Sequence, residues 1–358
     1  MNKHNTVKQS GLIGKLSEMF PFDWEILREA GAEPVPHHLK KWWFCLGGTV
    51  LYLFITQIVT GIALSFYYVP FPDEAYQSIS RLTQEIRFGW FIRSLHRWAS
   101  NFLIVALILH MLRVYFTGAY RHPRQFNWII GCLLFFLALT FGFTGYSLVY
   151  EQQSYWGTTV AANLTQSVPF VGPTIASFLR GGPEIGVNTL TRFYILHIGL
   201  LPTLSFILIA LHILLIRTHG VTELYFEGEE IPKEKQFFRF FPDHIMTELI
   251  IGMTLLYLLT ILALIYPIGL GPPADPNVTP EHIKPEWYFY FNFRLLKLTS
   301  LNVLFSSILF IGLIVLFWPF IEELLQKKYK FPDFVSVLIG IVCFLILVIF
   351  TVWESLST

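Results

Sequence analysis

The chain has 358 residues, of which 54% are hydrophobic and only 14% charged. A soluble domain carries about 25% charged residues, so this composition excludes an ordinary water-soluble protein. The formal net charge of +1 gives no electrostatic attraction for a nucleic acid. We therefore predict an integral membrane protein that is surrounded by lipid and binds no nucleic acid.

Residues 1–41 form the first predicted segment, a cytoplasmic N-terminal region. It contains no apolar stretch long enough for a signal peptide. Its aromatic and aliphatic residues predict a short amphipathic helix on the membrane surface. The apolar contacts of that helix would come from Met19, Phe20, Phe22, Trp24, Ile26 and Leu27.

Seven apolar stretches follow, each with about the 20 residues that a membrane-spanning helix requires. They cover residues 42–68, 95–117, 127–149, 193–217, 247–268, 300–322 and 333–353. The expected fold is an all-α integral membrane protein with seven transmembrane helices. A polar segment after the fourth span divides it into a four-helix bundle at 42–220, a linker at 221–246 and a three-helix module at 247–358.

Lysine and arginine are concentrated in the N-terminus and in the second, fourth and sixth connections. These residues stay preferentially on the cytoplasmic side of a membrane. We therefore expect the N-terminus inside and the C-terminus outside, in a plasma membrane of the bacterial type.

Two of the predicted spans each carry a pair of histidines. His96 and His110 are 14 residues apart, a rise of about 21 Å, and 14 steps of about 100° return nearly to the same helix face. His197 and His212 are 15 residues apart, a rise of about 22 Å. Two facing helices of this kind would clamp two ligands at two depths, His96 with His197 outside and His110 with His212 inside.

Paired imidazoles in an apolar bundle are typical of bis-histidine haem, whose iron has both axial positions filled and carries electrons. Zinc is disfavoured, because no Cys, Asp or Glu accompanies these histidines in the spans to complete a tetrahedral site. The alternative is that the histidines form interhelical hydrogen bonds. Two matched pairs favour haem over that alternative.

Two glycine pairs repeat the same spacing. Gly47 and Gly61 in the first span, and Gly131 and Gly145 in the third, are each 14 residues apart. Glycine lets a flat macrocycle approach a helix backbone closely. Small residues also serve ordinary helix packing in membranes, but the shared period with the histidines favours haem contact.

Five arginines lie near the ends of these spans. Arg93 and Arg97 are near the outer histidine pair, and Arg113, Arg124 and Arg217 are near the inner pair. Guanidinium groups bind carboxylates in a bidentate manner, so these arginines are candidates to neutralise haem propionates. The alternative is the ordinary positive charge found at membrane interfaces.

Several motifs together identify a family resemblance: "LHRWASNFLIVALILHMLRVYFTG", "GFTGYSL", "LTRFYILH", "PPADPNVTP" and "PEWYF". The chain resembles the cytochrome b family of quinol-oxidising complexes that contain a Rieske protein. Its seven spans, the His197/His212 spacing and "FCLGGT" are similar to a cytochrome b6 fused to subunit IV rather than to the eight-helix mitochondrial form. One departure is "VYEQ" at 149–152, where the family usually has Pro-Trp-Asp-Gln.

The resemblance implies a dihaem subunit that carries electrons between a quinol oxidation site and a quinone reduction site, coupled to proton translocation. It implies two haems b, and a haem c attached to Cys45 through one thioether; by itself, Cys45 would be read as a small buried hydrophobe. The quinone reduction site would lie near the inner haem, with Arg217 as a candidate residue. The implied partners are a Rieske iron–sulfur protein, a c-type cytochrome or similar acceptor, the quinone pool and a second copy of the complex.

The resemblance places quinol oxidation at the loop of Pro285, Glu286, Trp287 and Tyr288, here called the PEWY loop. Glu286 is a carboxylate in an aromatic, proline-stiffened segment, where desolvation would raise its pKa and make it a proton acceptor. Tyr288 is a second hydrogen-bonding candidate, and Trp287 would pack the pocket. Without the resemblance, Glu286 would be read as a surface charge.

Two other functions remain open from the sequence. A dihaem membrane anchor could connect a peripheral dehydrogenase or reductase to the quinone pool, but such an anchor needs no second module with a PEWY loop. A transporter with structural histidines would be expected to have broken helices around a midplane site. Here the histidines instead lie in two layers near the span ends.

Overall fold

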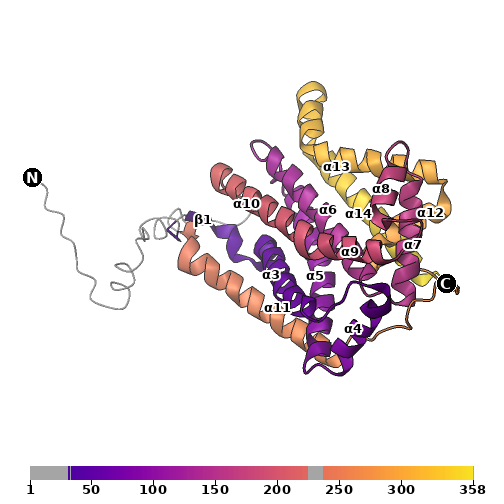
Figure 1. The fold of residues 1–358 in the computed structure, drawn as a ribbon. Helices are drawn as coiled ribbons and strands as arrows, with labels where there is room; N and C mark the ends of the chain where they lie inside the picture. The colour runs from indigo at the N-terminus through magenta and orange to yellow at the C-terminus, as the bar shows by residue number, and fades with distance from the viewer. Residues whose placement is uncertain (1–30, 33, 225–236, 358) are drawn as a thin grey trace, which may run out of the picture. The chain divides into compact units, whose positions relative to one another are not determined.

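Seven helical segments in the described part of the chain are long and apolar enough to cross a membrane. The computed structural model describes residues 31–32, 34–224 and 237–357 (Figure 1). The seven segments are Trp42–Ser65, Gly89–Phe116, Gln125–Ser147, Val187–His219, Phe240–Ile265, Leu301–Tyr329 and Asp333–Leu356. The predicted all-α membrane fold is confirmed. The amphipathic helix expected around residues 19–27 and much of the linker lie outside the described residues.

Several span boundaries differ from the prediction, two of them on α5 and α13. Helix α5 begins at Gly89 rather than at residue 95, and α13 ends at Tyr329 rather than at residue 322. Hydropathy marks only the part of a helix that lies in hydrocarbon. Both helices continue into polar sequence, where side chains such as Arg93 hydrogen-bond to backbone carbonyls.

The chain forms two compact units. The described residues of the first unit lie before Leu46 and between 223 and 251. In it, β1 (Pro34–Pro36) pairs antiparallel with β2 (Phe237–Arg239). The unit also contains η1 (His37–Lys40), η2 (Trp42–Cys45), η5 (Phe240–His244) and the first part of α11 (Ile245–Ile265). Its core is formed by Val35, Leu39 and Phe44.

The second unit contains the histidine-bearing helices. They are α3 (Leu46–Ser65), α5 (Gly89–Phe116), α6 (Gln125–Ser147) and a span made of α9 (Val187–Ile195), η3 (Leu196–Leu200) and α10 (Leu201–His219). Helix α3 packs against α5, and α6 packs against α10. Leu53, Leu103 and Leu107 lie in the core between them, and Ala99 is fully buried there because a small residue permits close helix approach.

Short helices connect these spans. They are α4 (Pro72–Gln84), α7 (Gln152–Gln166) and α8 (Gly172–Arg180). Their buried faces meet the start of α9 in a cluster that includes Ala75, Tyr155, Leu190 and Phe193. This cluster covers the end of the bundle at which α5 begins.

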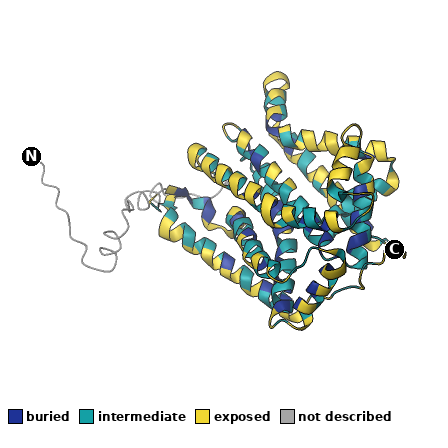
Figure 2. Cartoon of the chain, viewed as in Figure 1, coloured by how far each residue is buried: buried dark blue, intermediate teal, exposed yellow. Residues whose placement is uncertain are grey.

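The C-terminal module contains η6 (Trp287–Phe289), α12 (Tyr290–Leu298), α13 (Leu301–Tyr329) and α14 (Asp333–Leu356). Arg121, in the loop between α5 and α6, pairs with Glu322 of α13, which is 1% exposed. Tyr120 donates a further hydrogen bond to the same carboxylate. These contacts attach the module to the four-helix bundle. The long helices carry many exposed residues (Figure 2). Many of these are large hydrophobic residues, as a lipid environment requires.

Candidate functional site

His96 and His197 face each other from α5 and η3. Their ring centres are 6.5 Å apart. A glycine lies behind each ring: a methyl group at Gly61 would be 3.4 Å from His96 Cε1, and one at Gly145 would be 2.7 Å from His197 Cε1. We call this set the first layer. A methyl group at Gly145 would therefore crowd the His197 ring, whereas one at Gly61 would only touch the His96 ring.

The ring spacing fits a metal shared by two imidazoles. A metal–nitrogen bond of about 2 Å on each side places two coordinating ring centres about 6 Å apart. The described part of the chain brings no Cys, Asp or Glu to these rings that would complete a tetrahedral zinc site. The residues present thus fit a bis-histidine haem.

His110 and His212 occupy the second layer, on α5 and α10. The same glycine arrangement recurs, since a methyl group would be 3.4 Å from His110 Cε1 at Gly47 and 3.6 Å from His212 Cε1 at Gly131. Each of the four glycines thus lies opposite a different histidine. The 14-residue spacing that both glycine pairs share with His96 and His110 reflects this pairing.

Two threonines complete the first layer, and sequence reasoning missed them. Thr60 Oγ1 lies 2.8 Å from His96 Nδ1, and Thr144 Oγ1 lies 2.9 Å from His197 Nδ1. Each threonine immediately precedes a glycine of the first layer, in "VTG" and "FTG". That repeated Thr-Gly pair was the signal available in the sequence.

The arginines that were predicted to neutralise haem propionates differ in their contacts. Arg93 donates to the carbonyls of Ile268 and Gly269, and Arg124 donates to that of Gly220. Both therefore hold connecting loops. Arg113 follows His110 by about one turn of α5, and Arg217 lies near the end of α10.

The PEWY loop docks on the four-helix bundle beside the first layer. Arg97, which follows His96, donates a 2.6 Å hydrogen bond to Glu286. Trp287 Nε1 donates to Asn101 Oδ1 at 2.7 Å, one turn further along α5. The structure thus brings Glu286 to the His96 end of the bundle with its side chain 9% exposed.

Tyr288 packs against α6 at Gly142. A methyl group at Gly142 would meet the phenol, with Tyr288 Cζ only 2.8 Å away. Burial raises the pKa of Tyr288, with Glu286 adding to the rise and Arg97 opposing it. Tyr288 therefore stays protonated and can donate a hydrogen bond near Glu286.

The unusual "VYEQ" segment holds the chain that leads into the PEWY loop. Gly271 N donates to Glu151 Oε2 at 2.7 Å, and Gln152 N donates to the Pro272 carbonyl at 2.9 Å. Asp275 N donates to Gln152 Oε1 at 2.6 Å. The segment therefore positions residues 271–275, which precede the PEWY loop.

Cys45 lies in the first unit and is buried. Its thiol donates to the Leu39 carbonyl at 3.3 Å. The donor atoms of Cys45, His244 and Glu248 all lie within 4.8 Å of one another. The thiol that a thioether would use is thus surrounded by polar groups rather than by a purely apolar core.

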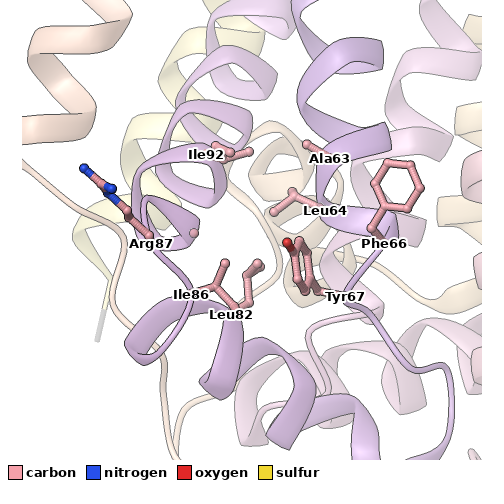
Figure 3. Close-up of a pocket in the computed structure, with 9 residues that line it drawn as sticks. Ala63, Leu64, Phe66, Tyr67, Leu82, Ile86, Arg87 and Ile92 are labelled. Atoms are coloured by element: carbon pink, nitrogen blue, oxygen red, sulfur yellow. The ribbon is translucent and has the colours of Figure 1, made fainter.

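A separate apolar cavity of about 250 Å³ lies where α3, α4 and α5 meet. Leu64, Leu82, Ile86 and Ile92 point into it, whereas the Arg87 guanidinium points away from them (Figure 3). None of the four histidines and no residue of the PEWY loop lines it. It is therefore distinct from the histidine site.

Two family models match the sequence. Cytochrome b/b6/petB matches residues 31–220, which is more than half of the chain, and Cytochrome b(C-terminal)/b6/petD matches residues 273–356. The chain belongs to the cytochrome b family. This membership confirms the predicted family and the predicted role of a cytochrome b subunit in a bc/b6f-type quinol oxidoreductase. Haem b is the cofactor that the family implies.

Some relatives match little more than half of this chain, and another matches almost all of it. Cytochrome b6 from Heliomicrobium gestii is 43% identical over 58% of this chain and 98% of that protein. The cytochrome bc complex cytochrome b subunit of Chlorobaculum thiosulfatiphilum is 34% identical over 99% of this chain and 84% of that protein. A solved hyperthermophilic respiratory Complex III chain has the same fold, with a TM-score of 0.77 and 24% identity over 95% of this chain and 97% of that one.

Proposed function

We propose that this cytochrome b carries electrons across the membrane from quinol oxidised at the PEWY loop to quinone reduced near His110 and His212. The observation that carries the proposal is the 2.6 Å contact between Arg97 and Glu286. Arg97 follows His96 directly in α5, so the contact joins the loop to the first layer. The electron and the proton that quinol oxidation releases would thus leave from the same end of the bundle, beside His96 and Glu286.

The four histidines would hold two haems b, His96 with His197 and His110 with His212. Haem b, when bound, supplies a one-electron carrier at each layer. Four glycines lie beside the imidazole rings: Gly47, Gly61, Gly131 and Gly145. Because glycine has no side chain, they would also let the haem macrocycles approach the helix backbones closely. Arg93, Arg97, Arg113, Arg124 and Arg217 remain the candidates for propionate neutralisation, and Arg217 also for the quinone reduction site.

Oxidation of a quinol releases two protons and two electrons, so this site needs a proton acceptor and two electron exits. Glu286 would accept one proton, because its carboxylate is nearly buried and lies at the loop. Tyr288 would donate a hydrogen bond to the bound quinol or quinone, and Pro285 and Trp287 would shape the pocket. The second electron would leave through a partner.

Cys45 would attach a haem c through a single thioether. Its buried thiol and the nearby donors of His244 and Glu248 support an occupied site rather than inert packing. Cys45 lies two residues before Gly47 in the chain, so the attached group would begin close in sequence to the second layer.

The natural acceptors would be a Rieske iron–sulfur protein and a c-type cytochrome or similar carrier, in a complex that forms a homodimer. The chain would lie in a bacterial-type plasma membrane with its N-terminus inside, as the distribution of lysine and arginine indicates. The PEWY loop and the first layer would then lie on the outer side. Proton release from Glu286 would be outward.

Redox difference spectroscopy of the purified complex tests the haem assignment. Replacing His110 or His212 by Leu removes one axial ligand of the second layer only. We expect either variant to lose one of two haems b and to keep the other. Retention of both haems in the two variants would contradict the proposed pairing.

A further inference from the structure

The two flanks of the PEWY loop are bound by the same end of α14. On the N-terminal flank, Lys284 Nζ donates to the Glu354 carbonyl at 3.2 Å and to the Ser357 carbonyl. On the C-terminal flank, Lys297 of α12 donates to the Glu354 carboxylate at 2.6 Å. Arg294 Nη1, also on α12, lies 3.4 Å from that carboxylate. We call these five residues the α14 clamp.

Lys284 complements the end of a helix. The last carbonyls of a helix have no partner within it, and the C-terminus carries a partial negative charge. Lys284 donates to the carbonyl of Glu354, in the last turn of α14, and to that of the cap residue Ser357. Its own carbonyl accepts from Gln153 Nε2 of α7 at 2.9 Å. The residue just before the loop is therefore held from two sides.

Glu354 is a carboxylate whose side chain has no exposed surface. A buried charge is costly unless its partners neutralise it. Lys297 and Arg294 supply the opposite charge, and the Ser357 hydroxyl donates to Glu354 Oε1 at 3.1 Å. The Arg294 guanidinium also stacks 3.7 Å from the ring centre of Trp353. Removing the carboxylate would leave two cations of α12 without this anion, so Glu354 holds α12 on α14.

The clamp and the four-helix bundle hold different parts of the same segment. Residues 282–286 form no regular secondary structure, so their conformation depends on contacts with other elements. Arg97 and Asn101 of α5 bind the loop itself, through Glu286 and Trp287. Helix α14 packs against both η6 and α12, and α12 lies beside it near the C-terminus (Figure 1). The docked loop therefore requires the clamp as well as α5.

We propose that Glu354 and Lys284 are positioning residues that keep the PEWY loop docked for quinol binding. This inference rests on the proposed oxidation of quinol at that loop. With the clamp broken, the loop would exchange between docked and undocked conformations, and only the docked one would bind quinol. The apparent affinity falls in proportion to the docked fraction, whereas saturating quinol selects the docked form. The KM for quinol should therefore rise while kcat stays near the parental value.

Steady-state quinol oxidation by the purified complex tests this, with the haem spectra recorded in parallel. Glu354→Gln keeps the size of the side chain and removes its charge, and Lys284→Met removes the donor. If the docked fraction falls to about one tenth, KM rises about tenfold in each variant and kcat changes by less than about twofold. The pH profile of kcat should stay parental, because Glu286 keeps its carboxylate. Lys284→Arg keeps a cation at the same carbonyls and should retain the parental KM.

Glu322→Gln is the matched control. Glu322 is a second buried carboxylate of the C-terminal module, but it binds Arg121 rather than a flank of the loop. It should lower the unfolding midpoint and leave the KM for quinol unchanged. If Glu354→Gln does not assemble, Lys284→Met decides the test.

An unchanged KM in the clamp variants would overturn the inference. A lower kcat at the parental KM would also overturn it, since that result indicates loss of folded complex rather than loss of docking. An equal rise of KM in Glu322→Gln would do the same, because the effect would then be general to the module. Absence of quinol oxidation by the parental complex would instead refute the proposed function.

Discussion

Arg97 and Glu286 are 189 residues apart in the chain, yet Arg97 Nη2 lies 2.6 Å from Glu286 Oε1. The contact joins the helix that carries His96 and His110 to the loop that the family resemblance assigns to quinol oxidation. A charge-assisted hydrogen bond of this length is among the stronger ones in proteins. The position of the loop beside the first layer therefore depends on a specific interaction as well as on the connecting chain.

Replacing Gly142 by Ala should displace the PEWY loop. The added methyl group would meet the Tyr288 phenol, whose Cζ would be 2.8 Å away. We expect quinol oxidation to slow at least tenfold, while both haem spectra stay intact, because none of the four histidines lies on α6. Steady-state quinol oxidation by the purified complex measures this effect.

Gly312→Ala on α13 is the control, since nothing lies within 4 Å of a methyl group there. A parental rate in Gly142→Ala would show that the loop tolerates displacement of Tyr288. Equal slowing in both variants would point to a general loss of folding.

The features that could be predicted from the sequence are those that follow from helical geometry alone. The rise of an α-helix is constant, so the spacing of His96, His110, His197 and His212 was enough to predict two layers. The hydroxyl of Thr60 could not be assigned in this way, because its role depends on a neighbour from another helix. Gly142 had no signal either, since its contact with Tyr288 arises only when distant segments dock.

Cys45→Ala tests the covalent haem. We expect the parental chain to retain a haem-staining band on a denaturing gel and the variant to lose it, with both haems b still present. Cys132→Ala is the control, because that cysteine lies elsewhere, on α6. An unstained parental band from a folded complex would leave Cys45 as a packing residue only.

Glu322→Ala should destabilise the attachment of the C-terminal module. The substitution removes the buried carboxylate that Arg121 and Tyr120 bind. Breaking a buried ion pair costs about 3–5 kcal/mol; Arg121 is 36% exposed and keeps Asp333 as a second partner, so we expect about 2–3 kcal/mol. Thermal unfolding followed by circular dichroism should show a lower midpoint.

The neighbouring Glu323 provides the comparison for that experiment. Its carboxylate is solvent-accessible and pairs with Lys327 along the same helix. Surface pairs of this kind contribute little, so Glu323→Ala should leave the midpoint almost unchanged. Equal midpoints in the two variants would mean that the Glu322 cluster adds nothing to stability.

The most direct test of the central claim is the rate of quinol oxidation in Glu286→Gln. Glutamine keeps the size of the side chain and removes the group that can accept a proton. A positioned general base typically contributes about 10²–10⁴-fold to a rate, so we expect a loss in that range with both haem spectra intact. The exposed loop residue Glu281 is the control, and Glu281→Gln should retain the parental rate. A parental rate in Glu286→Gln across the pH range would contradict the account, because Glu286 would then be only the partner of Arg97.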